Sequence, residues 1–185
     1  VFPLFNIEFM GLLKAEQAKG LKVNDPSNPG RTYFSGKGLD FPSDPDPETG
    51  QILKRVKDES NRQTSEMVQK LDNYLKQINA PIGFTFQEIK DDYAEDLVRE
   101  RHIAQAVRKK VFDVAGSDDD RIELLSKVFG SKPVKSSLND DNALEGEIRS
   151  NLLKAGGPAY VPEDENAFLE IDQVIDNIIK MGGIP

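Results

Sequence analysis

The stretch AEDLVRERHIAQAVRKKVFDVAG, residues 94–116, decides how this chain is interpreted. Its apolar residues recur at the three- and four-residue spacing of one helix face. Gly116 is typical of the residue after a helix end, because glycine adopts the left-handed conformation at little cost. The pattern therefore predicts a helix over residues 94–115. His102, the only histidine among 185 residues, borders its apolar stripe.

Several other segments have the same amphipathic character. Thr85 and Glu88 have the spacing of a capping box, which predicts a short helix that starts there. Ser117 and the three aspartates after it suit the start of another helix through side-chain capping and the helix dipole. Gly182 follows a strongly amphipathic last segment. The longer predicted helices cover residues 51–78, 94–115, 117–129, 137–155 and 168–181.

Strand-like segments occur near the N-terminal end. Residues 1–10 are nearly all apolar, with Glu8 as an exception, and they predict a buried strand. Residues 24–50 are rich in Pro, Gly, Asp and Asn, which favour loops, and a short strand or turn at 31–34 interrupts them. The fold class that we expect is mainly α, a helical insertion domain with short β segments at its ends. The chain starts with apolar residues and no Met, and it ends in GGIP. From these two features we expect the chain to be an excerpt from a larger protein that contains a sheet or a barrel.

Composition narrows the functional classes. The net charge of −8 argues against a uniformly basic face for non-specific nucleic-acid binding, although a local basic pocket near residues 99–110 is compatible with it. The chain has no cysteine, which removes disulfides, zinc–thiolate sites and thiol nucleophiles and fits a cytoplasmic protein. No apolar run approaches the roughly 20 residues that a membrane-spanning helix needs, so we expect no membrane partner.

The order of several short segments carries a family resemblance. They are NIE at 6–8, YFSGKGLD at 33–40, TFQEI at 85–89, RERHIAQAV at 99–107, the run 122–130, PAYVP at 158–162 and the run 174–183. In this order they resemble the middle of the polymerase-and-histidinol-phosphatase (PHP) family of metal-dependent phosphoesterases. The branch that is most similar carries a helical insertion in a distorted (β/α)7 barrel. The resemblance implies barrel strands and a loop over 1–50, the insertion over 51–162, and a helix returning to the barrel over 163–185.

The resemblance also implies roles for individual residues. Glu8 would be a metal-bridging carboxylate and His102 a metal ligand, while Arg99 and Arg101 would bind the substrate phosphate. Such enzymes hold divalent cations (Mn, Mg, Zn or Fe) that polarise a phosphoryl oxygen and lower the pKa of a bound water. The implied substrate is a small-molecule, nucleotide or oligonucleotide phosphate ester, and the implied partner is the remainder of the barrel.

The chain departs from the family pattern in ways that limit the implied chemistry. Tyr33 occupies the position of a histidine ligand, and Glu100 stands where the family usually has arginine. The His-X-His strand and the later Ala-His-Pro segment of the family are missing. One histidine and one glutamate cannot hold a multinuclear cluster, so we expect the isolated chain to be inactive and the other ligands to lie outside it.

Plainer interpretations stay open for each candidate residue. His102 is equally consistent with a residue that packs or caps a helix, and Glu8 with a solvent-facing carboxylate on an edge strand. Arg99 and Arg101 fit a solvated helix face. The alternative function for the whole chain is a helical structural or protein-interaction module without catalysis.

Overall fold

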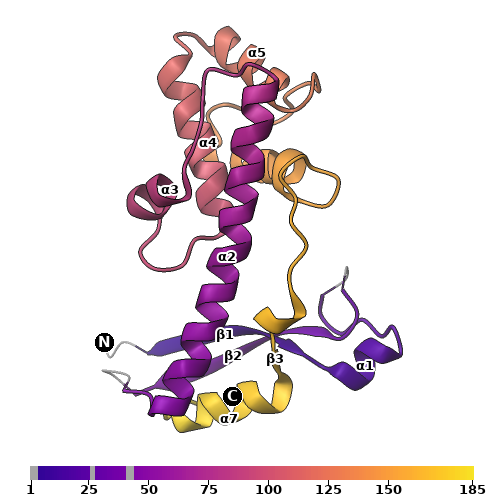
Figure 1. Ribbon diagram of the computed structural model, residues 1–185, viewed down its shortest axis with the longest axis vertical. Helices are drawn as coiled ribbons and strands as arrows, with labels where there is room; N and C mark the ends of the chain where they lie inside the picture. The colour runs from indigo at the N-terminus through magenta and orange to yellow at the C-terminus, as the bar shows by residue number, and fades with distance from the viewer. Residues whose placement is uncertain (1–3, 26–27, 41–43) are drawn as a thin grey trace. The chain divides into compact units, whose positions relative to one another are not determined.

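The computed structural model describes residues 4–25, 28–40 and 44–185. The chain divides into two compact units, which we call unit 1 (Val1–Glu59 and Asp164–Pro185) and unit 2 (Ser60–Glu163). Unit 2 is therefore inserted between two segments of unit 1 in the sequence (Figure 1). The described residues are mainly helical, as predicted, and the only sheet among them has three strands.

Unit 1 is a small sheet with helices. Its strands are β1 (Phe5–Leu12), β2 (Arg31–Leu39) and β3 (Leu169–Glu170), in the order β2-β1-β3. β1 pairs with β2 antiparallel and with β3 parallel. The helical elements are α1 (Lys14–Ala18), the 3₁₀ turn η2 (Glu165–Ala167), the first part of α2 (Pro47–Gln77) and α7 (Ile171–Lys180).

The core of unit 1 lies on one side of this sheet. Ile7 and Phe9 of β1 belong to one apolar cluster with Val174 and Ile178 of α7. Gly36 of β2 allows this packing, since a Cβ atom there would meet the Cγ2 atom of Ile178 at 2.5 Å. Side chains of a strand alternate between its two faces. α7 therefore covers the face of Ile7 and Phe9, and the intervening residues of β1 point to the other face.

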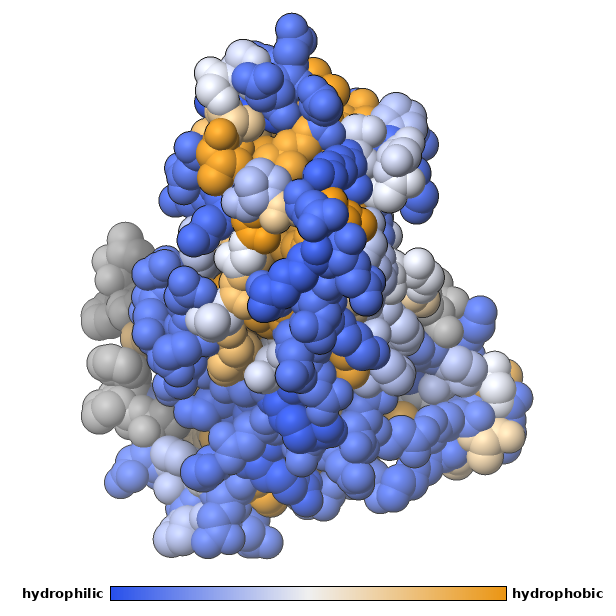
Figure 2. All heavy atoms as spheres, turned by 45° about the horizontal axis from the view of Figure 1, so that its top comes forward, coloured by the Kyte–Doolittle hydropathy of each residue, from blue (hydrophilic) through white to orange (hydrophobic). Residues whose placement is uncertain are grey.

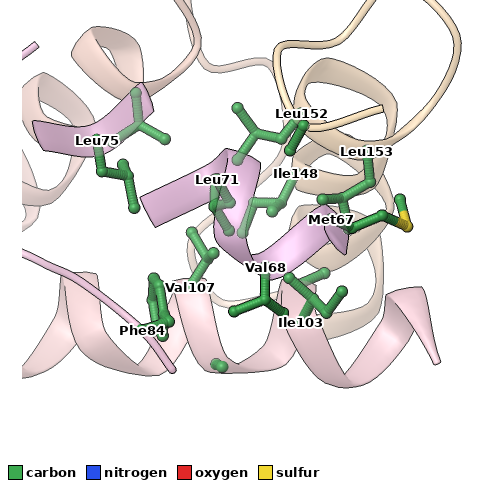
Figure 3. Packing of buried hydrophobic residues seen from close by; sticks show 14 of the residues in the cluster. Met67, Val68, Leu71, Leu75, Phe84, Ile103, Val107, Ile148, Leu152 and Leu153 are labelled. Atoms are coloured by element: carbon green, nitrogen blue, oxygen red, sulfur yellow. The ribbon is translucent and has the colours of Figure 1, made fainter. Parts of the chain in front are cut away.

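Unit 2 consists of helices around the second part of α2. They are α3 (Phe86–Tyr93), α4 (Glu100–Val114), α5 (Asp118–Val128), α6 (Asp141–Ile148) and the π-helical turn η1 (Arg149–Leu153). Apolar side chains three and four residues apart on α2, from Met67 to Leu75, are fully buried. Figure 3 shows Val68 and Leu71 among apolar side chains of α4 and of the α6–η1 segment. On the face shown in Figure 2, hydrophilic side chains predominate.

Local sequence signals located several helix ends correctly. The capping box of Thr85 and Glu88 is present, and Ser117 forms a second capping box with Asp120. Gly130 and Gly182 follow α5 and α7 with φ values of 73° and 76°, in the left-handed region that glycine tolerates. These ends were predictable because each depends on residues within one helical turn.

Other boundaries differ from the predictions. α2 begins at Pro47 rather than at 51, since the Asp46 carboxylate accepts hydrogen bonds from the backbone N–H groups of Glu48 and Thr49. The segment predicted as helical over 137–155 starts at Asp141 and ends in η1. The predicted strand at 31–34 extends to Leu39.

The predicted helix over residues 94–115 is wrong in its first turn. Arg99 has extended backbone angles, and α4 begins only at Glu100. The side chain of Asn61 on α2 holds the preceding loop: its amide donates to the carbonyl of Asp96 and its oxygen accepts from the N–H of Val98, both at 2.9 Å. This contact joins residues far apart in sequence, so the local pattern carried no sign of it.

Candidate functional site

Glu8 lies on the exposed face of the unit 1 sheet. It is paired with Ser35 across the antiparallel ladder, and its side chain is exposed. Within the described part of the chain its carboxylate has no hydrogen bond or ion pair. The prediction of a buried strand was wrong for the first half of β1. β3 pairs only with Gly11 and Leu12, so among the described residues β1 has a neighbouring strand on one side only at Glu8. The alternative of a solvent-facing carboxylate at a sheet edge therefore describes Glu8 in this structure. A carboxylate in this setting is free to bind a cation.

The same face carries the position where the family resemblance places a histidine. Tyr33 pairs with Met10, two residues from Glu8, and is 63% exposed. Diagonal neighbours of this kind have Cα atoms about 7–8 Å apart. The sheet thus brings Glu8 and Tyr33 to one side, but a tyrosine is a poor ligand for a divalent cation at neutral pH.

His102 occupies the third residue of α4 and caps that helix. Its Nδ1 atom accepts a hydrogen bond from the backbone N–H of Arg99 at 3.2 Å. The arginine side chain has no acceptor and cannot complete a reciprocal capping box. Arg101 places its Nε atom 3.3 Å from Nε2 of the same imidazole. The capping interpretation left open by the sequence therefore has a geometric basis.

The two contacts of His102 cannot both be hydrogen bonds to a neutral ring. A neutral imidazole has one acceptor nitrogen and one N–H donor. We assign the acceptor to Nδ1, because the Arg99 N–H is fixed by the backbone whereas the exposed Arg101 side chain can turn away. Nε2 then carries the proton. Metal binding through Nε2 would require the ring to release the Arg99 N–H, because a metal needs the lone pair on that nitrogen.

Electrostatics favour the neutral ring. Partial burial, followed by the positive charges of Arg101 and Arg99, lowers the pKa of His102 below its ordinary value of 6.5. Protonation would turn Nδ1 from an acceptor into a donor and would break the cap. His102 is consequently a neutral helix cap near pH 7 in this arrangement.

A cleft lies beside α4 in unit 2. It has a volume of about 640 Å³ and is lined by the loop 92–97 and by Arg101, His102, Gln105 and Lys109. Arg99 does not line it; this residue is exposed at the start of α4. Of the two arginines predicted to bind phosphate, only Arg101 lines this cleft. Lys109 belongs to the local basic pocket that the sequence left open. Gln105 was not predicted, although its four-residue spacing from Arg101 was visible in the sequence.

The predicted metal ligands do not form a metal centre by themselves. Glu8 belongs to unit 1 and His102 to unit 2. No group of three or more His, Cys, Asp or Glu side chains suited to a metal occurs in the residues that the structure describes. Any multinuclear centre that uses Glu8 therefore needs additional ligands from outside the described part of the chain.

Comparisons with known proteins found no relative. No protein-family model, no curated protein and no solved structure matches the chain. Among the described helices, none is long and apolar enough to cross a membrane.

Proposed function

We propose that this chain is part of a cytoplasmic metal-dependent phosphoesterase, in which Glu8 is a metal ligand and Arg99 and Arg101 contribute to phosphate binding. The remaining metal ligands come from other parts of the same protein, because one glutamate and one histidine are too few for the chemistry. The bound cations would supply charge stabilisation of the phosphoryl group and an activated water.

The observation that carries the proposal is the environment of Glu8. Its carboxylate is exposed and unpaired among the described residues, on the sheet face opposite α7. The face opposite α7 is the side of β1 from which a ligand can approach, and an exposed carboxylate there supplies the oxygen ligand that Mg²⁺ and Mn²⁺ prefer. The family resemblance implies the same role for this residue.

The test measures bound metal and hydrolysis of p-nitrophenyl phosphate in the full-length protein that contains this chain. Glu8→Gln should lower metal content and reduce kcat at least about 100-fold, since even residues that only orient metal ligands are worth 10–100-fold. Glu16→Gln is the matched control, because Glu16 belongs to α1 of the same unit. Arg101→Ala should raise KM while metal content stays unchanged.

His102 has a separate test that distinguishes metal binding from capping. Glutamine at the third helical position accepts the capping hydrogen bond as well as histidine does. If His102 binds a metal, His102→Gln will lose metal without losing helix stability. If the residue only caps α4, the variant will keep both metal and activity.

A helical module without catalysis is the second candidate function. It is favoured by the capping role of His102, whose Nδ1 atom accepts the N–H of Arg99. Unchanged metal content and unchanged kcat in both Glu8→Gln and His102→Gln would establish this function in place of the phosphoesterase.

A further inference from the structure

The cleft beside α4 has the size of a small-molecule site. Its volume of about 640 Å³ falls within the range of roughly 300–1,000 Å³ that is usual for ligand pockets. All of its lining residues belong to unit 2. One wall is residues 101–109 of α4, and the other wall is the segment 92–97, whose C-terminal end Asn61 holds in place through Asp96 and Val98.

The helix wall presents hydrogen-bond donors without an acidic partner; Arg101 contacts only the His102 ring, with its Nε atom 3.3 Å from Nε2. Arg101, Gln105 and Lys109 are four residues apart and share one face of α4. In the described part of the chain, neither cation has an ion pair, and the Gln105 amide has no hydrogen bond. By contrast, Arg108 on the same helix pairs with Asp141 and Glu145 at 2.9 Å. That Arg101 and Lys109 have no ion pair is notable, because the chain has 32 acidic and only 24 basic residues.

The loop wall has the opposite chemistry. Asp92 and Glu95 line the cleft, are exposed, and have no ion pair with any described residue. Tyr93 belongs to the same wall, and the Lys109 ammonium of the helix wall lies 5.9 Å from its ring centre. The loop carboxylates would repel a simple anion, and the helix cations would repel a simple cation. A ligand that satisfies both walls needs an anionic group at one end and neutral hydroxyl donors at the other.

We propose that this cleft binds a phosphorylated sugar, with the phosphate on Arg101, Gln105 and Lys109 and the sugar hydroxyls on Asp92 and Glu95. Arginine and lysine form charge-assisted hydrogen bonds with phosphate oxygens. An ionised carboxylate only accepts hydrogen bonds, so it suits hydroxyl donors. The site shares Arg101 with the proposed phosphoesterase function and rests on that function for the role of this residue, but it adds recognition of the sugar and uses neither Glu8 nor a metal.

Calorimetric titration of the intact protein with ribose 5-phosphate, inorganic phosphate and ribose tests this site. Ribose 5-phosphate should bind most tightly, inorganic phosphate more weakly, and ribose not measurably. Lys109→Gln should weaken ribose 5-phosphate about tenfold, the value of one charge-assisted hydrogen bond. Lys110→Gln is the matched control, because its side chain is on the same helix but outside the cleft. It should leave the affinity unchanged.

Glu95→Gln separates recognition of the sugar from recognition of the phosphate. It should weaken ribose 5-phosphate but leave inorganic phosphate unchanged or bound more tightly, since it removes a hydroxyl acceptor and a negative charge together. Tighter binding of adenosine 5′-monophosphate than of ribose 5-phosphate would identify a nucleotide as the source of the sugar phosphate. Equal affinities would identify the free sugar phosphate.

Two results would overturn the proposal. One is an affinity for ribose 5-phosphate no higher than that for inorganic phosphate, and the other is an equal loss in Lys109→Gln and Lys110→Gln. Glu8→Gln should bind ribose 5-phosphate like the unmodified protein. Failure of the metal site and failure of this cleft can therefore be told apart.

Discussion

The two units of this chain differ in how completely they bury their apolar faces. Unit 2 has a cluster of twenty-two buried apolar residues, contributed by every one of its helices. Unit 1 has five, gathered between one face of the sheet and α7. Its other sheet face carries Glu8 and Tyr33 in exposed positions. Unit 2 thus has the packing of a self-sufficient helical domain, whereas unit 1 leaves a strand face available for binding.

The difference shows where function and stability lie in this chain. In unit 2 the interior is filled by apolar side chains, so the candidate binding residues lie on its surface, at the cleft beside α4. In unit 1 the candidate ligand Glu8 projects from a strand of the sheet itself, on the face opposite α7. Substitutions in the two units should therefore have different consequences, and the following predictions test this contrast from the largest expected effect to the smallest.

Leu71→Ala should have the largest effect on stability. Leu71 is fully buried on α2 in the core of unit 2. Truncation of a buried leucine leaves a cavity and costs about 2–5 kcal/mol. Hydrogen exchange measured peptide by peptide should show the loss in residues 60–163. Gln69→Ala, at an exposed neighbouring position of the same helix, should change the free energy of unfolding by less than about 0.5 kcal/mol.

Gly36→Ala should destabilise unit 1 by about 1–3 kcal/mol, because the new methyl group overlaps Ile178. The clash includes the Cβ atom of Ile178 at 3.2 Å, so rotation of that side chain cannot relieve all of it. Gly146→Ala on α6 is the control in unit 2: a Cβ atom there meets nothing within 4 Å, and helix propensity should stabilise the variant by about 0.5–1 kcal/mol. Chemical denaturation of both variants shows whether each substitution raises or lowers the free energy of unfolding. Equal effects of the same sign would contradict this description of the sheet–α7 contact.

Asn61→Ala should cost about 1–3 kcal/mol in unit 2, because it leaves the N–H of Val98 and the carbonyl of Asp96 without their partner. Asn61→Asp keeps the acceptor for Val98 but sets a carboxylate oxygen against the carbonyl of Asp96, so it should cost at least as much. The same denaturation experiment compares the two variants. A clearly smaller loss in Asn61→Asp than in Asn61→Ala would show that the hydrogen bond to the Asp96 carbonyl does not help to hold the loop.

The smallest expected effect is the pH dependence from His102. Because the folded-state pKa lies below 6.5, the folded protein favours the neutral ring. The resulting stabilisation is complete at pH values above the pKa of His102 in the unfolded protein. It is lost as the pH falls through the lower pKa of His102 in the folded protein. Stability at about pH 7.5 should therefore exceed that at about pH 5, and His102→Gln should reduce the difference. Carboxylates such as Glu88, whose pKa is lowered by Thr85, lose their contribution only at more acidic pH.

The sequence located features of the candidate site but not their surroundings. The candidate status of His102 followed from its neighbours in the sequence, whereas its hydrogen bond to Arg99 depends on the helix starting at Glu100. That start depends in turn on Asn61, which lies on another helix. The exposure of Glu8 depends on which face of β1 is covered by α7, and the sequence of β1 alone does not contain that information.

The sequence by itself determined the mainly helical character, the apolar stripes and the helix ends at Thr85, Ser117, Gly130 and Gly182. These features depend on residues within a turn or two of each other, and local backbone geometry and side-chain capping are enough to specify them. Only the tertiary structure decided the start of α4, the exposed face of Glu8 and the cleft lined by Arg101, Gln105 and Lys109. Each of these depends on contacts between segments distant in sequence, whose energies override local propensity.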